Sequence, residues 1–412
     1  MLLASLLCVF LTAAQAPEKP ATFVKWNRTL PVGPQPCAIA TADLTGNGLP
    51  DLVTADRGTL TDLREERPAN DEISILLAQG KMEYQRYLPS LRSGFGPYAL
   101  ALANMDVLPW IDIVVANFHD TKHRDLSVFL NLRNDNVFKP LTFTVPDQDL
   151  PYNAQRDPEG NPLFATSGLT SLVVRDFNGD GFRDVCATAW ASDQLVLFPG
   201  AAEGILGNPR LIPLGGGPRD IQEYDFDRDG KRDLAVVLYR SAEVVLLKHI
   251  APMEFKEQAR FPTGGRLPTR LRMADINADG RMDIVVSHSY TDDSIVIFYA
   301  DNTPFSYTVS QTIRLGSDSR TLEKKICDIL PGDFNNDGRV DIAATCHFSG
   351  EVVVLFNQSK DATIPQSFRK EIYTYDNGKP YALCTADFDQ NGKPDLAVTL
   401  WEANAVAFLL GR

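Results

Sequence analysis

The sequence predicts an all-β protein, a seven-bladed β-propeller with four-stranded blades. Three observations predict it: an aspartate-rich nine-residue segment recurs along the chain, an apolar β-branched run follows each copy, and almost no segment has the period of an amphipathic helix. The copies recur every 49 to 72 residues, which suits one blade each with insertions in the longer units. One domain over residues 17–412 is therefore expected.

The repeated segment has the pattern Asp-x-polar-x-Asp/Asn-Gly-x-x-Asp, and six copies are complete. A seventh copy begins at Asn104 and keeps Asp106 and Asp112, but lacks the third oxygen ligand and the glycine. The oxygen-bearing side chains at positions 1, 3, 5 and 9 of the complete copies are Asp43, Thr45, Asn47 and Asp51; Asp176, Asn178, Asp180 and Asp184; Asp225, Asp227, Asp229 and Asp233; Asp275, Asn277, Asp279 and Asp283; Asp333, Asn335, Asp337 and Asp341; and Asp387, Asp389, Asn391 and Asp395.

This pattern predicts about six structural calcium ions. Calcium prefers six to eight oxygen ligands, and side chains at positions 1, 3 and 5 of a tight loop can converge on one ion. The glycine at position 6 permits the sharp turn, and the carbonyl at 7 with the carboxylate at 9 would complete the shell. Asp-Asn-Gly clusters can also be simple turns, but six copies with one spacing favour a metal. Six Ca²⁺ would bring the net charge of −13 close to zero.

Helical calcium modules are excluded by position 12 of the repeat. An EF-hand places an acidic ligand there and a helix on either side of the loop. The residues at position 12 are instead strand formers or alanine, namely Thr54, Ala187, Val236, Val286, Ala344 and Val398.

Four strands are predicted in each unit. An inner strand precedes the loop, as at 98–103 and 381–386, and a β-branched second strand follows it, as at 51–55, 233–237 and 283–287. Third strands are expected at 73–77, 126–130, 195–198, 243–247, 295–298, 351–355 and 405–409, and a more polar edge strand completes each unit.

The phase of the repeat predicts how the ring closes. The chain starts with an edge-type strand, Ala21 to Trp26, and ends after a third strand near Leu410, so that the N-terminal strand can complete the last blade. An open solenoid is the alternative architecture, but it would need capping units that the sequence does not contain.

At this point the residues resemble FG-GAP repeats, as found in the propellers of integrin α-subunits, and more closely the bacterial VCBS-type version. The resemblance covers residues 17–412 and implies a calcium site in the hairpin between the first and second strands of a blade, with ligands at positions 1, 3, 5 and 9. The sequence departs from the family because it lacks the literal Phe-Gly and Gly-Ala-Pro tags, and Thr45 replaces an acidic or amide ligand. Propellers host many functions, so the resemblance implies a fold more than an activity.

Residues 1–16 are predicted to be a signal peptide that is cleaved after Ala16. An apolar run from Leu2 to Ala14 leads into Ala-Gln-Ala, which has the small residues that signal peptidase accepts. An uncleaved anchor is the alternative, although the run is short for a bilayer span. The expected location is therefore extracellular or periplasmic, with the protein secreted as a monomer and not inserted in a membrane.

Composition and charge limit the partners. The chain is 44% hydrophobic and 23% charged, as in an ordinary globular protein, and its negative charge argues against nucleic acid. Five cysteines follow the leader, an odd number, so at least one thiol stays unpaired and most are interpreted as buried small side chains. These cysteines are Cys37, Cys186, Cys327, Cys346 and Cys384.

A ligand site is predicted on the rim opposite the calcium loops. The residue six positions after position 9 is large and polar or aromatic in most units, and the series is Arg57, Phe118, Trp190, Tyr239, Ser289, His347 and Trp401. Aromatic rings with polar tips around a funnel suit sugar faces, and Phe118, Trp190, Tyr239, His347 and Trp401 are the candidate ligand-binding residues. The alternative interpretation is that these rings only pack neighbouring blades together.

These features favour a binding or adhesion module for an extracellular glycan or protein. The alternative is a carbohydrate-active enzyme, a polysaccharide lyase or glycoside hydrolase, on the same propeller. A carboxylate pair could come from Asp56, Asp120, Asp193, Asp292 or Glu402, and an acid–base or metal site from His119, His288 or His347. The chain contains no Ser-His-Asp elbow, phosphate loop or dinucleotide fingerprint. Insertions at 57–71 and 134–167 are either functional loops or surface excursions.

Overall fold

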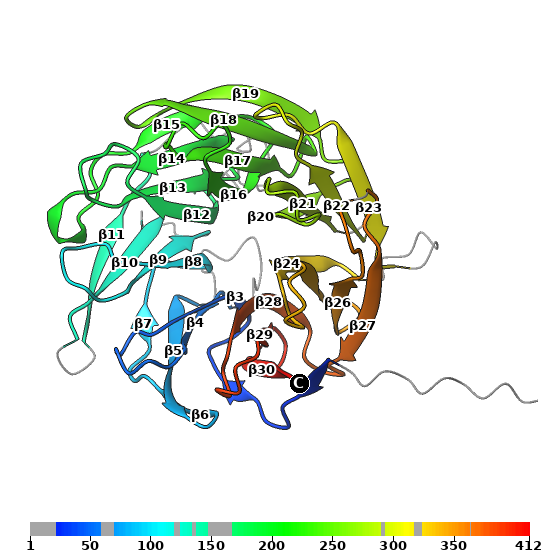
Figure 1. Cartoon of the computed structure of the whole chain (residues 1–412). Coiled ribbons are helices and arrows are strands. Elements are labelled where there is room, and N and C mark those ends of the chain that lie inside the picture. The colour runs from blue at the N-terminus through cyan, green and yellow to red at the C-terminus, as the bar shows by residue number, and fades with distance from the viewer. Residues whose placement is uncertain are drawn as a thin grey trace, which may run out of the picture.

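In the computed structural model, seven antiparallel sheets form a ring around a central axis (Figure 1). The structure describes residues 22–58, 70–118, 124–133, 137–146, 167–289, 293–316, 324–362 and 364–412. Each inner strand contacts the inner strand of the next blade, and β28 of blade 7 contacts β3 of blade 1. The predicted all-β, seven-bladed fold with four strands per blade is therefore confirmed.

The first four blades follow each other in chain order. Counted from the axis outward, their strands are β3 (Pro36–Ala42), β4 (Asp51–Asp56), β5 (Glu72–Gly80) and β6 (Glu83–Arg86), with the short β7 (Leu91–Arg92) beside β5; β8 (Pro97–Ala103), β9 (Asp112–Asn117), β10 (Leu126–Asn131) and β11 (Phe138–Phe143); β12 (Leu169–Arg175), β13 (Asp184–Ala189), β14 (Gln194–Phe198) and β15 (Arg210–Pro213); and β16 (Pro218–Tyr224), β17 (Asp233–Leu238), β18 (Glu243–Ala251) and β19 (Glu254–Pro262).

The last three blades continue the ring. Their strands are β20 (Pro268–Ala274), β21 (Asp283–His288), β22 (Ser294–Tyr299) and β23 (Val309–Arg314); β24 (Ile326–Gly332), β25 (Asp341–Cys346), β26 (Glu351–Asn357) and β27 (Phe368–Thr374); and β28 (Pro380–Ala386), β29 (Asp395–Leu400) and β30 (Ala405–Gly411), with β1 (Phe23–Lys25) and β2 (Leu30–Pro31) beside β30. A 3₁₀ turn, η3 (Ala202–Gly204), lies between β14 and β15.

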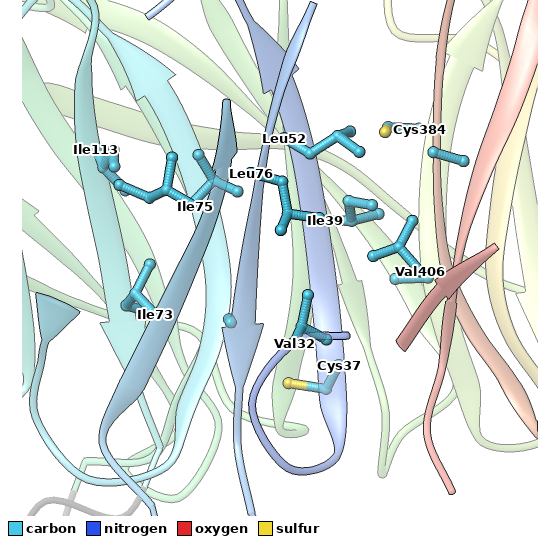
Figure 2. Close-up of a cluster of buried hydrophobic side chains, with 14 of the residues drawn as sticks. Val32, Cys37, Ile39, Leu52, Ile73, Ile75, Leu76, Ile113, Cys384 and Val406 are labelled. Atoms are coloured by element: carbon cyan, nitrogen blue, oxygen red, sulfur yellow. The ribbon is translucent and has the colours of Figure 1, made fainter. Parts of the chain in front are cut away.

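The second strand of every blade is buried along its whole length. Both faces of these β-branched runs pack against neighbouring blades, as in any strand that is covered on two sides. One cluster joins three blades: Ile39 and Leu52 of blade 1 pack with Val406 of blade 7 and Ile113 of blade 2 (Figure 2). The hydrophobic core is therefore a ring of inter-blade contacts around the axis.

The N-terminal strand lies on the last blade. β1 pairs antiparallel with β30, in a register that sets Phe23 opposite Gly411. The segment is also tied to blade 6, because the backbone N–H of Thr22 donates to Glu371 at 3.0 Å and that of Phe23 donates to the Tyr373 hydroxyl at 3.1 Å. Ala21 of the predicted strand and the predicted signal peptide lie outside the described residues.

The five cysteines of the described residues are all buried, and none of them forms a disulfide. This burial fits their interpretation as small apolar side chains, and it raises the pKa of each thiol. Over the described part of the chain, no helix is long and apolar enough to cross a bilayer.

Candidate functional site

Two sites lie on opposite rims of the ring. The aspartate-rich segments connect the first and second strands of the blades, as between β3 and β4, and therefore lie at one end of the sheets. Because the second strand runs antiparallel to the first, the residues that follow the second strand lie at the other end. The repeat thus places every predicted metal ligand on one rim and every predicted ligand-binding residue on the other.

The first aspartate of each complete loop organises the turn. Its two carboxylate oxygens accept hydrogen bonds from backbone N–H groups within the loop, and in blade 1 the donors to Asp43 are Asn47 at 3.0 Å and Gly48 at 2.7 Å. The same arrangement recurs at Asp225 and Asp333. The glycine at position 6 has φ between 81° and 90° in all six complete loops, a conformation that favours glycine.

The donor set of the loops fits a hard cation. In blade 4 a carboxylate oxygen of each of Asp225, Asp227 and Asp229 lies within 4.8 Å of the others, and Asp387, Asp389 and Asp395 converge in the same way in blade 7. Buried oxygens at position 3 lack a hydrogen-bond partner in three loops; they are Thr45 Oγ1, Asp227 Oδ1 and Asn277 Oδ1. A metal cation that prefers oxygen ligands, placed at the centre of these loops, would coordinate oxygen atoms that have no hydrogen-bond partner among the described residues.

Cationic side chains also reach three of the loops. The Lys248 ammonium contacts the carboxylate of Asp227 and lies 3.3 Å from that of Asp229. The position 7 arginines of blades 5 and 6 pair with the carboxylate at position 5, Arg281 with Asp279 and Arg339 with Asp337. These pairs offset part of the repulsion among the carboxylates.

The aspartate at position 9 has a structural role in every blade. Its side chain accepts a backbone N–H from position 2 of the loop and another from the end of the third strand, as Asp233 does from Phe226 at 3.0 Å and from His249 at 2.8 Å. Burial raises the pKa of these carboxyl groups above the ordinary aspartate value, as at Asp283, where the pKa is about 7. The seven residues are Asp51, Asp112, Asp184, Asp233, Asp283, Asp341 and Asp395.

In blade 2 the aspartate at position 9 keeps its structural role, although the loop lacks some of the predicted metal ligands. Asp112 accepts from Met105 N and Asn131 N, each at 2.7 Å, although its loop lacks the glycine and the ligand at position 5. Asp106 instead accepts from Leu108 N within its own loop. The sequence predicted position 9 only as a metal ligand, and its hydrogen bonds to the backbone were missed.

A cavity of about 310 Å³ lies on the axis at the opposite rim. All seven residues of the predicted series line it: Arg57, Phe118, Trp190, Tyr239, Ser289, His347 and Trp401. The structure therefore brings together the five candidate ligand-binding residues. Tyr98, Arg219, Thr269, Lys325, Ile326, Cys327 and Tyr381 complete the lining.

Five of these additional residues, all but Lys325 and Ile326, lie at a repeated irregularity of the inner strands. In every blade the register between the first and second strands shifts at the second residue of the inner strand. Such a bulge redirects a side chain, and Tyr98, Arg219 and Thr269 occupy this place in β8, β16 and β20. Sequence reasoning missed them, although a proline precedes each, and this recurring pair is the pattern that could have revealed them.

The aromatic side chains form a belt around most of the cavity. The ring centroids of Phe118 and Trp190 lie 6.0 Å apart, those of Trp190 and Tyr239 lie 6.3 Å apart, and Tyr381 stacks on Trp401 at 4.7 Å. Phe118 is buried between blades, whereas Trp190, Tyr239 and Trp401 are half-buried. Phe118 therefore packs neighbouring blades together, whereas the other three rings retain surface at the cavity.

The electrostatic character of the cavity is positive. Burial raises the pKa of the Tyr98 hydroxyl, but the guanidinium groups of Arg219, Arg270 and Arg57 outweigh burial and leave the pKa below its ordinary value. Burial, with Lys325 and Lys379 nearby, lowers the pKa of His347 to about 4, so this imidazole is neutral at pH 7. Arg219 donates to the Tyr98 hydroxyl, which lies 3.3 Å from that of Tyr381.

The carboxylates considered for catalysis do not line the cavity where the structure describes them. Asp193 pairs with Arg240 and accepts from Gly217 N at 2.6 Å, and Glu402 is exposed. Asp56 is buried and accepts from Gly33 N at 3.1 Å and Ser74 Oγ at 2.6 Å.

The three histidines proposed for a metal or acid–base site are not brought together in the described residues. His288 is fully buried away from the cavity, and His347 lines it. Neither converging group of ligand atoms contains a histidine. His119, Asp120, Tyr290 and Asp292, and most of the insertions at 57–71 and 134–167, lie outside the described residues.

The fold and loops together define a propeller built from aspartate-loop repeats. The model of the FG-GAP-like repeat matches at residues 176–236, 225–286, 275–344 and 333–398, which together span more than half of the chain. The chain belongs to the FG-GAP-like repeat family. No curated protein matches it.

Solved structures with the same fold are distant in sequence. The chain is similar to BBS1N, crystallised in complex with ARL6DN, in a mercury soak (13% identity, TM-score 0.58, covering 95% of this chain and 97% of that one) and in a lead soak (14%, 0.61, 95% and 98%). A protein from Lactobacillus plantarum is 14% identical with a TM-score of 0.55, covering 84% of this chain and 86% of that chain. At these identities the likeness shows the fold alone.

Proposed function

We propose that the protein is a secreted binding module that takes an extracellular glycan into the central cavity. The observation that carries the proposal is that the residue six positions after position 9 lines one cavity in all seven blades. A cavity of about 310 Å³ is at the lower end of the range of roughly 300–1,000 Å³ for ligand sites and has room for a sugar unit or two.

The half-buried rings support a sugar ligand. Trp190, Tyr239 and Trp401 each keep part of their surface uncovered by protein. Apolar ring faces with polar edges suit pyranose rings, whose C–H faces are apolar and whose hydroxyl groups are polar. Ser289 also lines the cavity, and its hydroxyl, which has no hydrogen-bond partner among the described residues, is a candidate partner for a sugar hydroxyl.

Calcium is proposed as a structural cofactor of this module. The all-oxygen donor sets and the unsatisfied oxygens at position 3 support six sites, one in each complete loop. Bound calcium would neutralise crowded carboxylates and hold each hairpin in shape. The protein's own residues hold the turn through position 1 and anchor the hairpin to the third strand through position 9.

A protein partner is the second candidate. The similar propeller BBS1N is described in complex with ARL6DN, and that description supports considering a protein ligand for this propeller as well. We favour a glycan because the aromatic residues converge on a concave hollow at the axis rather than on a broad flat face.

A glycan array and a polysaccharide-degradation screen on the same sample test the proposal. Saturable binding that weakens at least tenfold in Trp190→Ala and Trp401→Ala, with unchanged melting temperature, is expected. Trp110→Ala is the control, because Trp110 stacks on Arg133 and does not line the cavity. Turnover that is lost on changing Asp193, Glu402 or His347 would instead identify an enzyme.

A further inference from the structure

The charge of the cavity is opposite to that of the whole protein. The chain has a net charge of −13, yet the described lining contains Arg57, Arg219 and Lys325 and no aspartate or glutamate. His347 adds no positive charge at pH 7, because its pKa is lowered to about 4. A positive hollow in an acidic protein is a local site that attracts a negatively charged ligand.

Arg219 is one of the three cationic residues that line this cavity. Its guanidinium lies 4.8 Å from the centroid of the Tyr98 ring, and it donates to the hydroxyl of the same tyrosine. Within the described chain no carboxylate pairs with Arg219, and its Nε is buried without a hydrogen-bond partner. A buried guanidinium without an ionic partner is costly, and an anion in the cavity would reduce that cost.

The neighbouring arginines of the inner strands are paired instead. Arg272 bridges Asp220 at 2.7 Å and Asp328 at 2.9 Å, and Arg270 lies 3.3 Å from Asp328. These two carboxylates also accept backbone N–H groups, from Leu271 in one case and from Leu383 in the other. The inner strands of blades 4 and 5 therefore neutralise two of their three arginines and leave the one that faces the cavity.

We propose that the central cavity binds an acidic saccharide, with the carboxylate of the sugar held by Arg219 and Lys325 and the ring placed against Trp190 or Trp401. This inference rests on the proposed function and names the class of its ligand. Arginine presents a fork of N–H donors that matches a carboxylate, and the low dielectric of a half-buried site strengthens the pairing. A sulfate ester has similar chemistry, and the experiment separates the two.

Titration calorimetry with acidic oligosaccharides and their carboxyl-reduced counterparts tests the inference. The panel consists of oligomers of galacturonate, glucuronate and mannuronate, together with the same oligomers after reduction of the carboxylate to a primary alcohol. A 6-O-sulfated galactan oligomer and inorganic sulfate are the other arms. At least one acidic oligomer should bind at least ten times more tightly than its reduced form, and added salt should weaken that binding.

Two adjacent lysines provide a matched pair of variants. Lys325 lines the cavity, whereas Lys324 pairs with Glu351 outside it. Lys325→Met should weaken binding of the acidic oligomer about tenfold. Lys324→Met should leave the affinity unchanged. Arg219→Met, if the variant folds, should also weaken binding of the acidic oligomer. Arg219→Lys should retain part of the affinity that Arg219→Met loses.

The outcomes separate the two proposals. Reduced oligomers that bind as tightly as acidic ones would overturn the anionic ligand and leave the glycan module standing. Inorganic sulfate that saturates a site dependent on Lys325, without binding of any saccharide, would overturn the glycan and keep the anion site. Preference for the sulfated oligomer would replace the carboxylate with a sulfate ester, and no binding in any arm would overturn both.

Discussion

The Nζ atom of Lys248 lies 3.3 Å from the carboxylate of Asp229 and also contacts Asp227, so that an ammonium group sits among the predicted metal ligands of blade 4. Lys248 comes from β18 and is half-exposed. The carboxylates raise the pKa of this lysine above its ordinary value, and they are the groups that a calcium ion would need. A calcium ion in this loop would therefore compete with the lysine for one pair of oxygens.

Replacing Lys248 should change the affinity of a single site. Lys248→Gln removes the competing charge, so the blade 4 loop should bind calcium several-fold more tightly, whereas Asp229→Ala should remove one ion and leave the propeller folded. Lys256→Gln is the control, because Lys256 lies opposite Lys248 on β19. Calcium titration followed by calorimetry measures the change, and equal affinity in both glutamine variants would contradict it.

Chelation should lower the melting temperature strongly. A metal that binds only the folded chain stabilises it by mass action, about 2.7 kcal/mol for each site at a free concentration one hundred times Kd. Metal analysis should find about six calcium ions per chain, and Asp106→Ala should leave the number unchanged because its loop is incomplete. An unaltered melting curve in excess chelator would count against structural calcium.

Asp112 should matter for stability without any metal. Asp112→Asn removes one acceptor from a buried site where Met105 N and Asn131 N both donate, and an unsatisfied buried N–H costs about 1–3 kcal/mol. Asp106→Asn, in the same loop but exposed to solvent at its hydrogen bond, should cost little. Urea unfolding measures both, and equal stabilities would show that position 9 is not a structural anchor.

Asp56 should make stability depend on pH. Burial raises the pKa of this carboxyl to about 7 in the folded protein, against 3.8 when unfolded. The folded state therefore holds a proton that the unfolded state has lost, and stability falls as pH rises from about 4 to 7, by about 1.4 kcal/mol per unit at most. Above pH 7 this loss is complete.

Asp56→Asn is the matched variant, because Asn117 occupies the equivalent place at the end of β9 in blade 2. Denaturant unfolding in saturating calcium should show wild type losing on the order of 2–3 kcal/mol relative to the variant between pH 5 and pH 8. Parallel profiles for the two proteins would show that Asp56 does not titrate in this range.

Deleting Thr22 to Trp26 should expose an edge of the last blade. β1 covers β30 from Phe23 to Lys25, and uncovered strand edges pair with other chains. The truncated protein should melt at a lower temperature and form aggregates in size-exclusion chromatography. A truncated protein that stays monomeric and melts like the full chain would contradict a closing role for this strand.

The fold and the loops could be predicted from the sequence because each repeat contains the residues that determine its local structure. An aspartate at position 9 followed by a mostly apolar run marks the start of the second strand, and β4, β17 and β29 begin at that residue. That the residue six positions after position 9 lies at the cavity was also predictable. The second strands have the same length in every blade, so they end at the same height along the axis of the ring.

The rest of the cavity lining depends on features that periodicity does not report. A bulge changes the direction of one side chain without changing the hydrophobic pattern around it, and so Arg219 and Tyr98 were missed. Their charges and contacts come from blades that are far apart in sequence: Tyr98 meets Arg219 across 121 residues. The pairing of Arg272 with Asp220 and Asp328 likewise depends on the packing of blade 5 between blades 4 and 6.

The bulge near the start of each inner strand also bears on how such a ring can acquire new ligands. A bulged residue stands outside the regular pairing of its strand, so its side chain can be exchanged with little effect on the hydrogen bonds of the blade. Cysteine, tyrosine, threonine and arginine already occupy the place in different blades of this one chain. Each blade thus carries one bulged residue, and in five of the seven blades this residue lines the cavity, so that specificity can diverge there while the framework stays unchanged.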